Sequence, residues 1–344
     1  ICLVGSEMCI RDRLQHYTDL ASYYHAIDPD PPVELISIPL FHSFGIGMTT
    51  QTLIRGGSAI YMDRFRPREF LQAIADYGVT HFTAVATMLI QLLQETDLLH
   101  SLDLSTLTYV HCGAAPSGAA LLEEAAEALG VRVFHVYGTT ECGGVFGHPP
   151  DDIISLDSCG RILPGVEVKL IDNEGSESDR GELWVRSPGI ALGYRNLKKA
   201  SMDRFRGDWY RTGDILRRDS QDNYYFVSRV DDMFVCGGEN IYPLEVEKVL
   251  YQHPGVKDAC VVPVQHAVKG HAPVAAVVKS TKSGVDQQSI KDFYLEKAPA
   301  YSHPRMVHFV DELPIAPTGK IDRKSVAKMM ADIAEISNFG GLKG

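Results

Sequence analysis

The sequence predicts an α/β protein of two domains, a larger one with a parallel sheet and a smaller α+β one. Three observations lead to this prediction. Residues 33–136 alternate short β-rich runs with helical patterns, antiparallel hairpins follow residue 150, and a second α+β pattern follows residue 232. Strand, helix and strand with short connections are typical of a βαβ unit. At 344 residues the chain is long enough for two domains.

The elements of the parallel sheet can be read in order. Residues 67–77 begin with Pro67 and carry apolar side chains at helical spacing, which predicts a helix. Residues 117–129 are rich in Ala, Leu and Glu and are followed by Gly130, which predicts a helix and its end. A second predicted helix spans 87–95, and the predicted strands are 79–85, 107–112 and 131–137.

Antiparallel structure is expected next, and then the small domain. Turn residues at 172–175 and at Asp222-Asn223 separate two pairs of β-rich runs. The small domain is predicted to contain helices at 243–252, 286–297 and 322–335 and strands at 260–262, 274–278 and 306–310. We place the boundary near Asp231, so that the predicted domains are 14–231 and 232–336, with a frayed tail at 337–344.

Composition excludes several classes of protein. Hydrophobic residues make up 45% and charged residues 22%, which is ordinary globular usage, and no apolar run is long enough for a membrane span. A net charge of -11 argues against a nucleic-acid-binding face. The seven cysteines form no CxxC pattern, so we expect reduced thiols and a cytoplasmic location. Composition does not predict the oligomeric state.

Residues 1–13 need separate treatment. They lack the order of a signal peptide, and the run Met-Cys-Ile-Arg-Asp at 8–12 matches the translation of a sequencing adapter. We interpret residues 1–13 as an adapter-derived scar and exclude them from the predicted fold. A natural N-terminus is the alternative.

Two loops are predicted to follow neighbouring strands of the parallel sheet. One begins with Gly113 and Ala114, and the other is Tyr-Gly-Thr-Thr-Glu at 137–141. Ligands of open parallel sheets bind beyond the carboxyl ends of the strands. The first loop has little side-chain bulk, so a flat ring could lie against it, and the second offers an aromatic face, two hydroxyls and a carboxylate. Ordinary β-to-α turns are the alternative reading.

These loops and other segments, in this order, resemble the adenylate-forming superfamily of acyl-CoA synthetases, peptide-synthetase adenylation domains and luciferases. The resemblance covers essentially everything from Leu14 onward. The sequence of residues 237–243 is most similar to that of acyl- and aryl-CoA ligases. The matching segments are Pro-Leu-Phe-His at 39–42 with Gly45, the Gly113 loop, residues 137–141, Gly-Glu-Leu at 181–183 through Gly193-Tyr194, Tyr-Arg-Thr-Gly-Asp at 210–214, Arg-Val-Asp-Asp at 229–232, Gly-Gly-Glu-Asn-Ile-Tyr-Pro at 237–243 with Glu-Val-Glu at 245–247, and Pro-Thr-Gly-Lys-Ile-Asp-Arg at 317–323.

The resemblance implies an adenylate-forming fold and a two-step reaction. A carboxylic acid reacts with ATP to give an acyl-adenylate and pyrophosphate, and the acyl group then passes to coenzyme A. Mg²⁺ assists the first step.

The resemblance also implies a role for each matching residue. Tyr137 would stack on adenine with Gly113, Ala114 and Gly138 beside it. Asp214 would bind the ribose hydroxyls, with Arg229 assisting at the ribose or phosphate. Glu141 would hold Mg²⁺, with Thr139 and Thr140 near the α-phosphate, and Lys320 would bridge the carboxylate and the α-phosphate.

His42 would line the acyl pocket, or else be a core histidine; Gly143 and Gly144 would leave room there. Asp231 would be the hinge, Gly237 and Gly238 would line the pantetheine tunnel, and Asn240 would contact the nucleotide or CoA.

One element of the resemblance is missing. The phosphate loop of the superfamily precedes a Leu-x-His segment, which Leu14-Gln15-His16 matches, and residues 1–13 hold no such loop. We therefore expect a truncated large domain: the 344 residues adenylate poorly, and a longer parent is the ligase. The alternatives are an enzyme that loads a carrier-protein thiol and a nucleotide-binding remnant without turnover.

Overall fold

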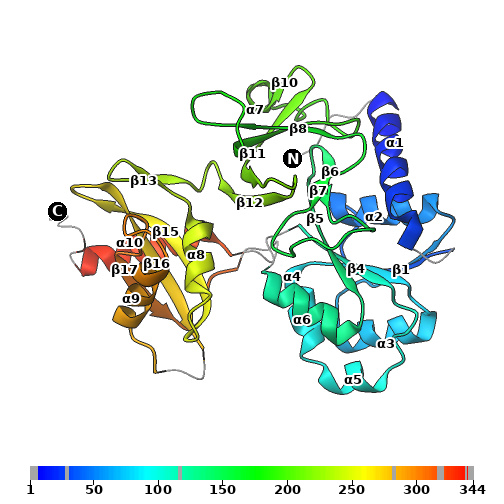
Figure 1. Ribbon diagram of the computed structural model, residues 1–344, viewed down its shortest axis with the longest axis horizontal. Coiled ribbons are helices and arrows are strands. Elements are labelled where there is room, and N and C mark those ends of the chain that lie inside the picture. The colour runs from blue at the N-terminus through cyan, green and yellow to red at the C-terminus, as the bar shows by residue number, and fades with distance from the viewer. Residues whose placement is uncertain are drawn as a thin grey trace. The chain divides into compact units, whose positions relative to one another are not determined.

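The computed structural model describes residues 7–27, 31–114, 118–280, 284–315, 321–337 and 339. Internal contacts divide the chain into two units, Ile1–Phe226 and Val227–Gly344 (Figure 1). The division lies a few residues before Asp231, within strand β12 (Tyr224–Arg229).

The first unit is built on a seven-stranded sheet with the order β2-β1-β3-β4-β5-β6-β7. Strands β1 to β5 are parallel, and β6 and β7 continue the sheet antiparallel. The parallel βαβ arrangement that the sequence predicts is therefore confirmed. The strands are β1 (Val33–Ile36), β2 (Ser58–Tyr61), β3 (His81–Ala84), β4 (Tyr109–Cys112), β5 (Arg132–Thr139), β6 (Gly143–Gly147) and β7 (Arg161–Ile162).

Helices cover both faces of this sheet. Figure 1 shows α3, α5 and α6 on one side and α1 and α2 on the other. Side chains of β4 alternate accordingly, since Val110 and Cys112 join the core under α3, α4 and α6, whereas Tyr109 packs with Tyr24 of α1. The helices are α1 (Glu7–Tyr24), the short 3-10 helix η1 (His25–Ile27), α2 (Ser43–Ile54), α3 (Pro67–Tyr77), α4 (Ala86–Leu93), α5 (Thr96–Ser101) and α6 (Ala119–Leu129).

Helix α1 crosses the boundary that the sequence suggests after residue 13. It begins at Glu7 and continues to Tyr24, so residues 7–13 are helical, although we excluded them from the predicted fold. Their origin from an adapter stays a prediction.

A second, antiparallel sheet completes the first unit. Its order is β10-β11-β9-β8, and β12 pairs with β11. Apolar side chains of this sheet pack against β6, so the two sheets share one core. Its elements are β8 (Glu167–Ile171), β9 (Arg180–Arg186), α7 (Lys198–Arg204), β10 (Phe205–Arg206), β11 (Trp209–Arg218) and β12.

The second unit is a five-stranded sheet with helices and one core on each face. A long hairpin pairs β15 (Val256–His266) with β16 (Gly270–Lys279), and β17 (Met306–Val310) runs parallel to β16. The expected tail is partly packed, because the Phe339 ring lies 6.0 Å from that of His266. The remaining elements are β13 (Phe234–Cys236), β14 (Glu239–Ile241), α8 (Pro243–Leu250), α9 (Gln287–Lys297) and α10 (Arg323–Ile336).

Two general expectations can be compared with the structure. Cys112, Cys142, Cys159, Cys236 and Cys260 are buried and form no disulfide bond. No helix among the described residues has the length and apolar character that crossing a membrane requires.

Candidate active site

The two predicted loops begin side by side at the carboxyl edge of the parallel sheet, although residues 137–139 of the second belong to strand β5. Strands β4 and β5 are parallel neighbours, with Cys112 opposite His135. Gly113 follows directly and is pressed against β5, because a Cβ at this position would lie 2.6 Å from Val136 O. Only glycine fits there. Ala114 adopts a positive φ of 65°, and residues 115–117 lie outside the described part of the chain.

Tyr137 and Asp214 join the two sheets. The Tyr137 hydroxyl donates to Oδ2 of Asp214 at 2.5 Å. Asp214 is buried, and its backbone N–H donates to Oγ1 of Thr212 at 3.0 Å. Burial and the neighbouring Asp214 carboxylate together hold the pKa of Tyr137 well above its usual value, so this phenol remains a donor.

An irregularity in β11 aims Asp214. The pairing of β11 with β9 shifts register between Arg211 and Ile215, and Gly213 within this bulge has a φ of 75°. A bulge re-aims the side chain beside it. The Tyr-Arg-Thr-Gly-Asp motif therefore forms a strand interrupted at its carboxylate.

Gly138 forms the base of the second loop. A Cβ there would lie 2.3 Å from Gly143 O, so the hairpin of β5 and β6 closes only on glycine. Thr139 lies at the end of β5, with Oγ1 3.1 Å from Cys142 Sγ. Gly138 itself is exposed, directly after Tyr137.

Glu141 is held by its backbone and by one carboxylate oxygen. Its carbonyl accepts a hydrogen bond from Ala191 N at 2.7 Å, and its Oε1 accepts one from the Tyr194 hydroxyl at 2.7 Å. Among the residues that the structure describes, no hydrogen bond reaches Oε2. Burial, reinforced by the Glu141 contact, raises the pKa of Tyr194 to about 12.

Arg13 of α1 fixes the backbone of the same loop. Its guanidinium donates to Gly189 O at 2.7 Å, to Thr140 O at 3.2 Å and to Glu141 O at 3.4 Å. The residue thus binds to the loop that carries the predicted metal ligand. Sequence reasoning missed Arg13, because we assigned it to the excluded residues 1–13.

His42 is the N-cap residue of α2, and the residue after it, Ser43, lies close to Thr140. Nδ1 of His42 accepts a hydrogen bond from Phe44 N at 3.2 Å and caps the helix, and Ser43 Oγ lies 3.4 Å from Thr140 Oγ1. The imidazole is exposed, so the alternative reading of His42 as a core histidine is wrong.

Gly143 and Gly144 do not provide the room that the sequence suggested. A Cβ on Gly143 would lie 3.1 Å from the His16 ring, and one on Gly144 would lie 3.2 Å from Leu20. Side chains of α1 fill the space beside both glycines. This part of the expected acyl pocket is therefore closed by α1.

The remaining predicted residues belong to the second unit. Arg229 ends β12, and its carbonyl accepts hydrogen bonds from Asp232 N and Met233 N in a turn that contains Asp231. Gly237 and Gly238, with φ of 60° and 93°, join β13 to β14, which carries Asn240. Lys320 lies outside the described residues.

A buried ion pair lies three residues beyond Lys320. Arg323 donates to both carboxylate oxygens of Glu247, at 2.8 and 2.6 Å, and to Val261 O at 3.1 Å. The Glu247 side chain is 3% exposed, and its carboxylate raises the pKa of Arg323. The start of α10 is therefore anchored to α8 and β15.

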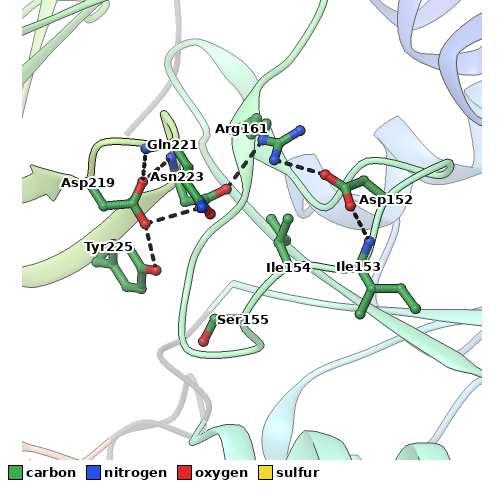
Figure 2. A pocket seen from close by; sticks show the side chains of 9 residues that line it. All are labelled: Asp152, Ile153, Ile154, Ser155, Arg161, Asp219, Gln221, Asn223 and Tyr225. Atoms are coloured by element: carbon green, nitrogen blue, oxygen red, sulfur yellow. Dashed lines mark hydrogen bonds and ion pairs between the residues drawn. The ribbon is translucent and has the colours of Figure 1, made fainter.

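A polar cavity of about 430 Å³ in the first unit contains none of these residues (Figure 2). Figure 2 shows Arg161 between Asp152 and Asn223, and Asp219 accepting from Tyr225. Because the side chains of Arg161, Asp152 and Asp219 already bind neighbouring lining residues, we assign no function to this cavity.

Comparison with protein families identifies the two parts of the chain. Residues 12–195 match the model of the AMP-binding enzyme family, and residues 245–320 match the model of the AMP-binding enzyme C-terminal domain.

Curated relatives are CoA ligases. The chain is 33% identical over 310 residues to 4-coumarate–CoA ligase-like 9 of Arabidopsis thaliana, covering 87% of this chain and 55% of the relative. It is 35% identical over 311 residues to the medium/long-chain-fatty-acid–CoA ligase FadD8 of Mycobacterium tuberculosis, covering 87% and 54%. The chain thus spans a little over half the length of these relatives.

Solved structures share the fold. The amide bond synthetase McbA from Marinactinospora thermotolerans superposes with a TM-score of 0.86 at 30% identity, covering 95% of this chain and 66% of that one. The o-succinylbenzoate CoA synthetase of Bacillus subtilis, in complex with an acyl-adenylate intermediate, gives 0.80 at 30% identity, with coverages of 91% and 64%. The chain belongs to the AMP-binding enzyme family and has the adenylate-forming fold.

Proposed function

We propose that this chain is part of an ATP-dependent carboxylate–CoA ligase, which forms an acyl-adenylate and then a CoA thioester. The observation that carries the proposal is the meeting of Gly113, Tyr137, Asp214 and Glu141 at one edge of the parallel sheet. The names of the relatives support the chemistry, since they are ligases of aryl and fatty acids.

The nucleotide is proposed to lie between the two loops. The Tyr137 ring and the bare backbone of Gly113, Ala114 and Gly138 suit a flat base. Asp214 is buried, and its carboxylate can accept hydrogen bonds from the ribose hydroxyls. Thr139 and Thr140 offer hydroxyls for a phosphate.

Glu141 fits the role of a magnesium ligand. Mg²⁺ prefers oxygen ligands and often binds one carboxylate together with substrate phosphates. One oxygen of Glu141 accepts from Tyr194, and the other receives no hydrogen bond from a described residue. A bound Mg²⁺ would offset the charge of the phosphates.

The second unit is proposed to complete the reaction. Lys320 would neutralise charge that develops between the carboxylate and the α-phosphate, and Arg229 would assist at the ribose or phosphate. Gly237, Gly238 and Asn240 would serve the incoming CoA, with Asp231 as the hinge. His42 would line the acyl pocket.

We further propose that the 344 residues adenylate slowly, because their sequence contains no phosphate loop of the GxxxxGK[ST] kind or rich in Ser, Thr and Gly before Leu14. Carboxylate-dependent exchange of pyrophosphate into ATP tests this with panels of aryl and fatty acids. We expect AMP binding that D214N weakens, with little exchange. Exchange at a rate normal for a ligase would contradict the slow-adenylation proposal, and AMP binding that D214N leaves unchanged would contradict the assigned site.

The acceptor is tested separately on the full-length gene product. Formation of an acyl-CoA thioester supports the ligase, whereas transfer only to a carrier-protein thiol supports the alternative. AMP binding without any product in the full-length protein would support a nucleotide-binding remnant.

A further inference from the structure

Tyr194 contacts Glu141 but has no role in the function proposed above. Its hydroxyl donates to Glu141 Oε1 at 2.7 Å across 53 residues of sequence. A donor on one carboxylate oxygen fixes the orientation of the whole group, because the two oxygens share a plane.

Packing holds the Tyr194 side chain in place. Its backbone N–H donates to Ser201 Oγ at 2.8 Å, and its ring meets the Phe205 ring edge-on with centroids 5.4 Å apart. Gly193 before it has a φ of 145° and lies against Ser201, which a side chain at 193 would contact. Helix α7 and the start of β10 therefore determine where the hydroxyl points.

A second tyrosine supports the first. Tyr210 of β11 is 4% exposed, and its hydroxyl lies close to that of Tyr194. Its ring also packs on Phe205, with centroids 5.0 Å apart. The sequence of contacts runs from Tyr210 through Tyr194 to Glu141.

We propose that Tyr194 is a positioning residue for the metal site, with Tyr210 as its support. Tyr194 binds Oε1 of Glu141, so that the carboxylate is oriented in advance and Oε2 is left for the ion. This inference rests on the proposed role of Glu141. Partners of metal ligands of this kind change metal affinity by about tenfold or more when they are removed.

The test measures Mn²⁺ binding to this chain in the presence of ATP, through the electron paramagnetic resonance signal of free Mn²⁺. Binding of AMP without metal and the melting temperature are measured on the same samples. The variants are Y194F and Y210F, which remove only a hydroxyl, with E141Q as the reference.

Y225F is the matched control. Tyr225 also donates to a carboxylate in the first unit, at 3.0 Å to Asp219 Oδ2, in the polar cavity described above (Figure 2). Y225F removes the same kind of hydrogen bond, but from a carboxylate to which we assign no metal ion.

We expect Y194F to raise the Kd for Mn²⁺ about tenfold and Y210F about threefold, with AMP binding unchanged. Y225F should leave both within about twofold, and E141Q should raise the Kd about a hundredfold. If Y194F fails to fold, the Mn²⁺ affinity of Y210F decides whether the proposal holds.

The inference is overturned if E141Q weakens Mn²⁺ binding but folded Y194F does not, and the role of Glu141 then stands. It is also overturned if Y194F lowers metal-free AMP binding as strongly as Mn²⁺ binding, because the tyrosine is then merely structural. If E141Q has no effect, or the unmodified chain shows no saturable Mn²⁺ site, the metal assignment itself fails and the inference with it.

Discussion

The Tyr137 hydroxyl lies 2.5 Å from Oδ2 of Asp214, although the two residues belong to different sheets of the first unit. The bond fixes the ring proposed to stack on adenine relative to the carboxylate proposed to bind ribose. Hydrogen bonds to charged groups contribute about 1.5–3 kcal/mol.

The first prediction separates the contribution of the Tyr137 ring to AMP binding from that of its hydrogen bond to Asp214. Y137F keeps the ring and loses the bond, so the affinity for AMP should fall about tenfold. D214N should lower the affinity for AMP by a similar factor. The double variant should lower it by less than the product of the two factors, because both changes remove the same interaction. Calorimetric titration with AMP measures all three. Fully independent effects would show that the two residues do not act as a pair.

Gly113 is predicted to tolerate no side chain. In G113A the new methyl group would lie 2.6 Å from Val136 O and 2.7 Å from Val136 Cγ2, so the backbone must move. We expect a loss of about 1–3 kcal/mol in unfolding free energy, together with weaker AMP binding. Thermal melting by circular dichroism measures the loss. G284A, which meets no atom within 4 Å, is the control and should melt unchanged.

Glu34 should make the stability of the first unit depend on pH. It is fully buried in β1, where Thr52 and Thr83 donate to its two oxygens at 2.7 and 3.1 Å. Burial raises its pKa to about 7. Between pH 4.5 and 7 the folded state therefore binds more protons than the unfolded state, and stability falls as pH rises, by about 3 kcal/mol in total.

The E34Q variant isolates this contribution. Trp184 and Trp209 both lie in the first unit, so urea unfolding followed by tryptophan fluorescence reports that unit. The advantage of the unmodified chain over E34Q should shrink from pH 4.5 to pH 7 and then stay constant. Buried His111, whose pKa burial lowers to about 3, has the opposite effect but is present in both proteins. A difference that does not vary with pH would contradict the assignment.

The Arg323–Glu247 pair should stabilise the second unit only as a pair. R323A leaves the buried Glu247 carboxylate without its guanidinium, which should cost about 3–5 kcal/mol. E247L/R323M removes both charges and should recover most of that loss. Differential scanning calorimetry measures these losses. R66A, which breaks the exposed pair of Arg66 with Glu69, should cost at most about 1 kcal/mol. A double variant no more stable than R323A would contradict this account.

Local patterns were sufficient to predict most elements between α3 and β5 and the edge of the sheet at which the loops meet. Strand β4 and the loop after it follow from an apolar run and glycine, and parallel pairing then places Gly113 beside β5. The hairpin of β15 and β16 shows the limit. The predicted strands 260–262 and 274–278 each stop short of a proline. Pro263 and Pro273 face each other at one register position, and both strands continue past them.

Contacts between distant segments could not be predicted in this way. Tyr194 contacts Glu141 because α7 and β10 pack against the tyrosine and hold it there. No local sequence pattern predicts this contact. Helix α2 was missed because Gly45 and Gly47 disfavour helix formation. Both glycines are needed by packing, since a Cβ on Gly45 would lie 2.6 Å from Pro39 O and one on Gly47 would lie 3.3 Å from Tyr17.

The final prediction concerns Arg13, which tests whether α1 belongs to the site. Its guanidinium binds three carbonyl oxygens, of Thr140, Glu141 and Gly189. R13A should therefore destabilise the first unit by about 1–2 kcal/mol and weaken Mn²⁺ binding in the presence of ATP. R13K should restore little of either loss, because an ammonium group cannot span the same three carbonyl oxygens. Q15A, which removes an exposed hydrogen bond to Asp19 on the same helix, is the control. Tryptophan fluorescence during urea unfolding and the Mn²⁺ titration provide the readouts. If R13A behaves like Q15A, the contacts of Arg13 contribute nothing to the fold. If it behaves as predicted, Arg13 is a working part of the domain whatever its origin.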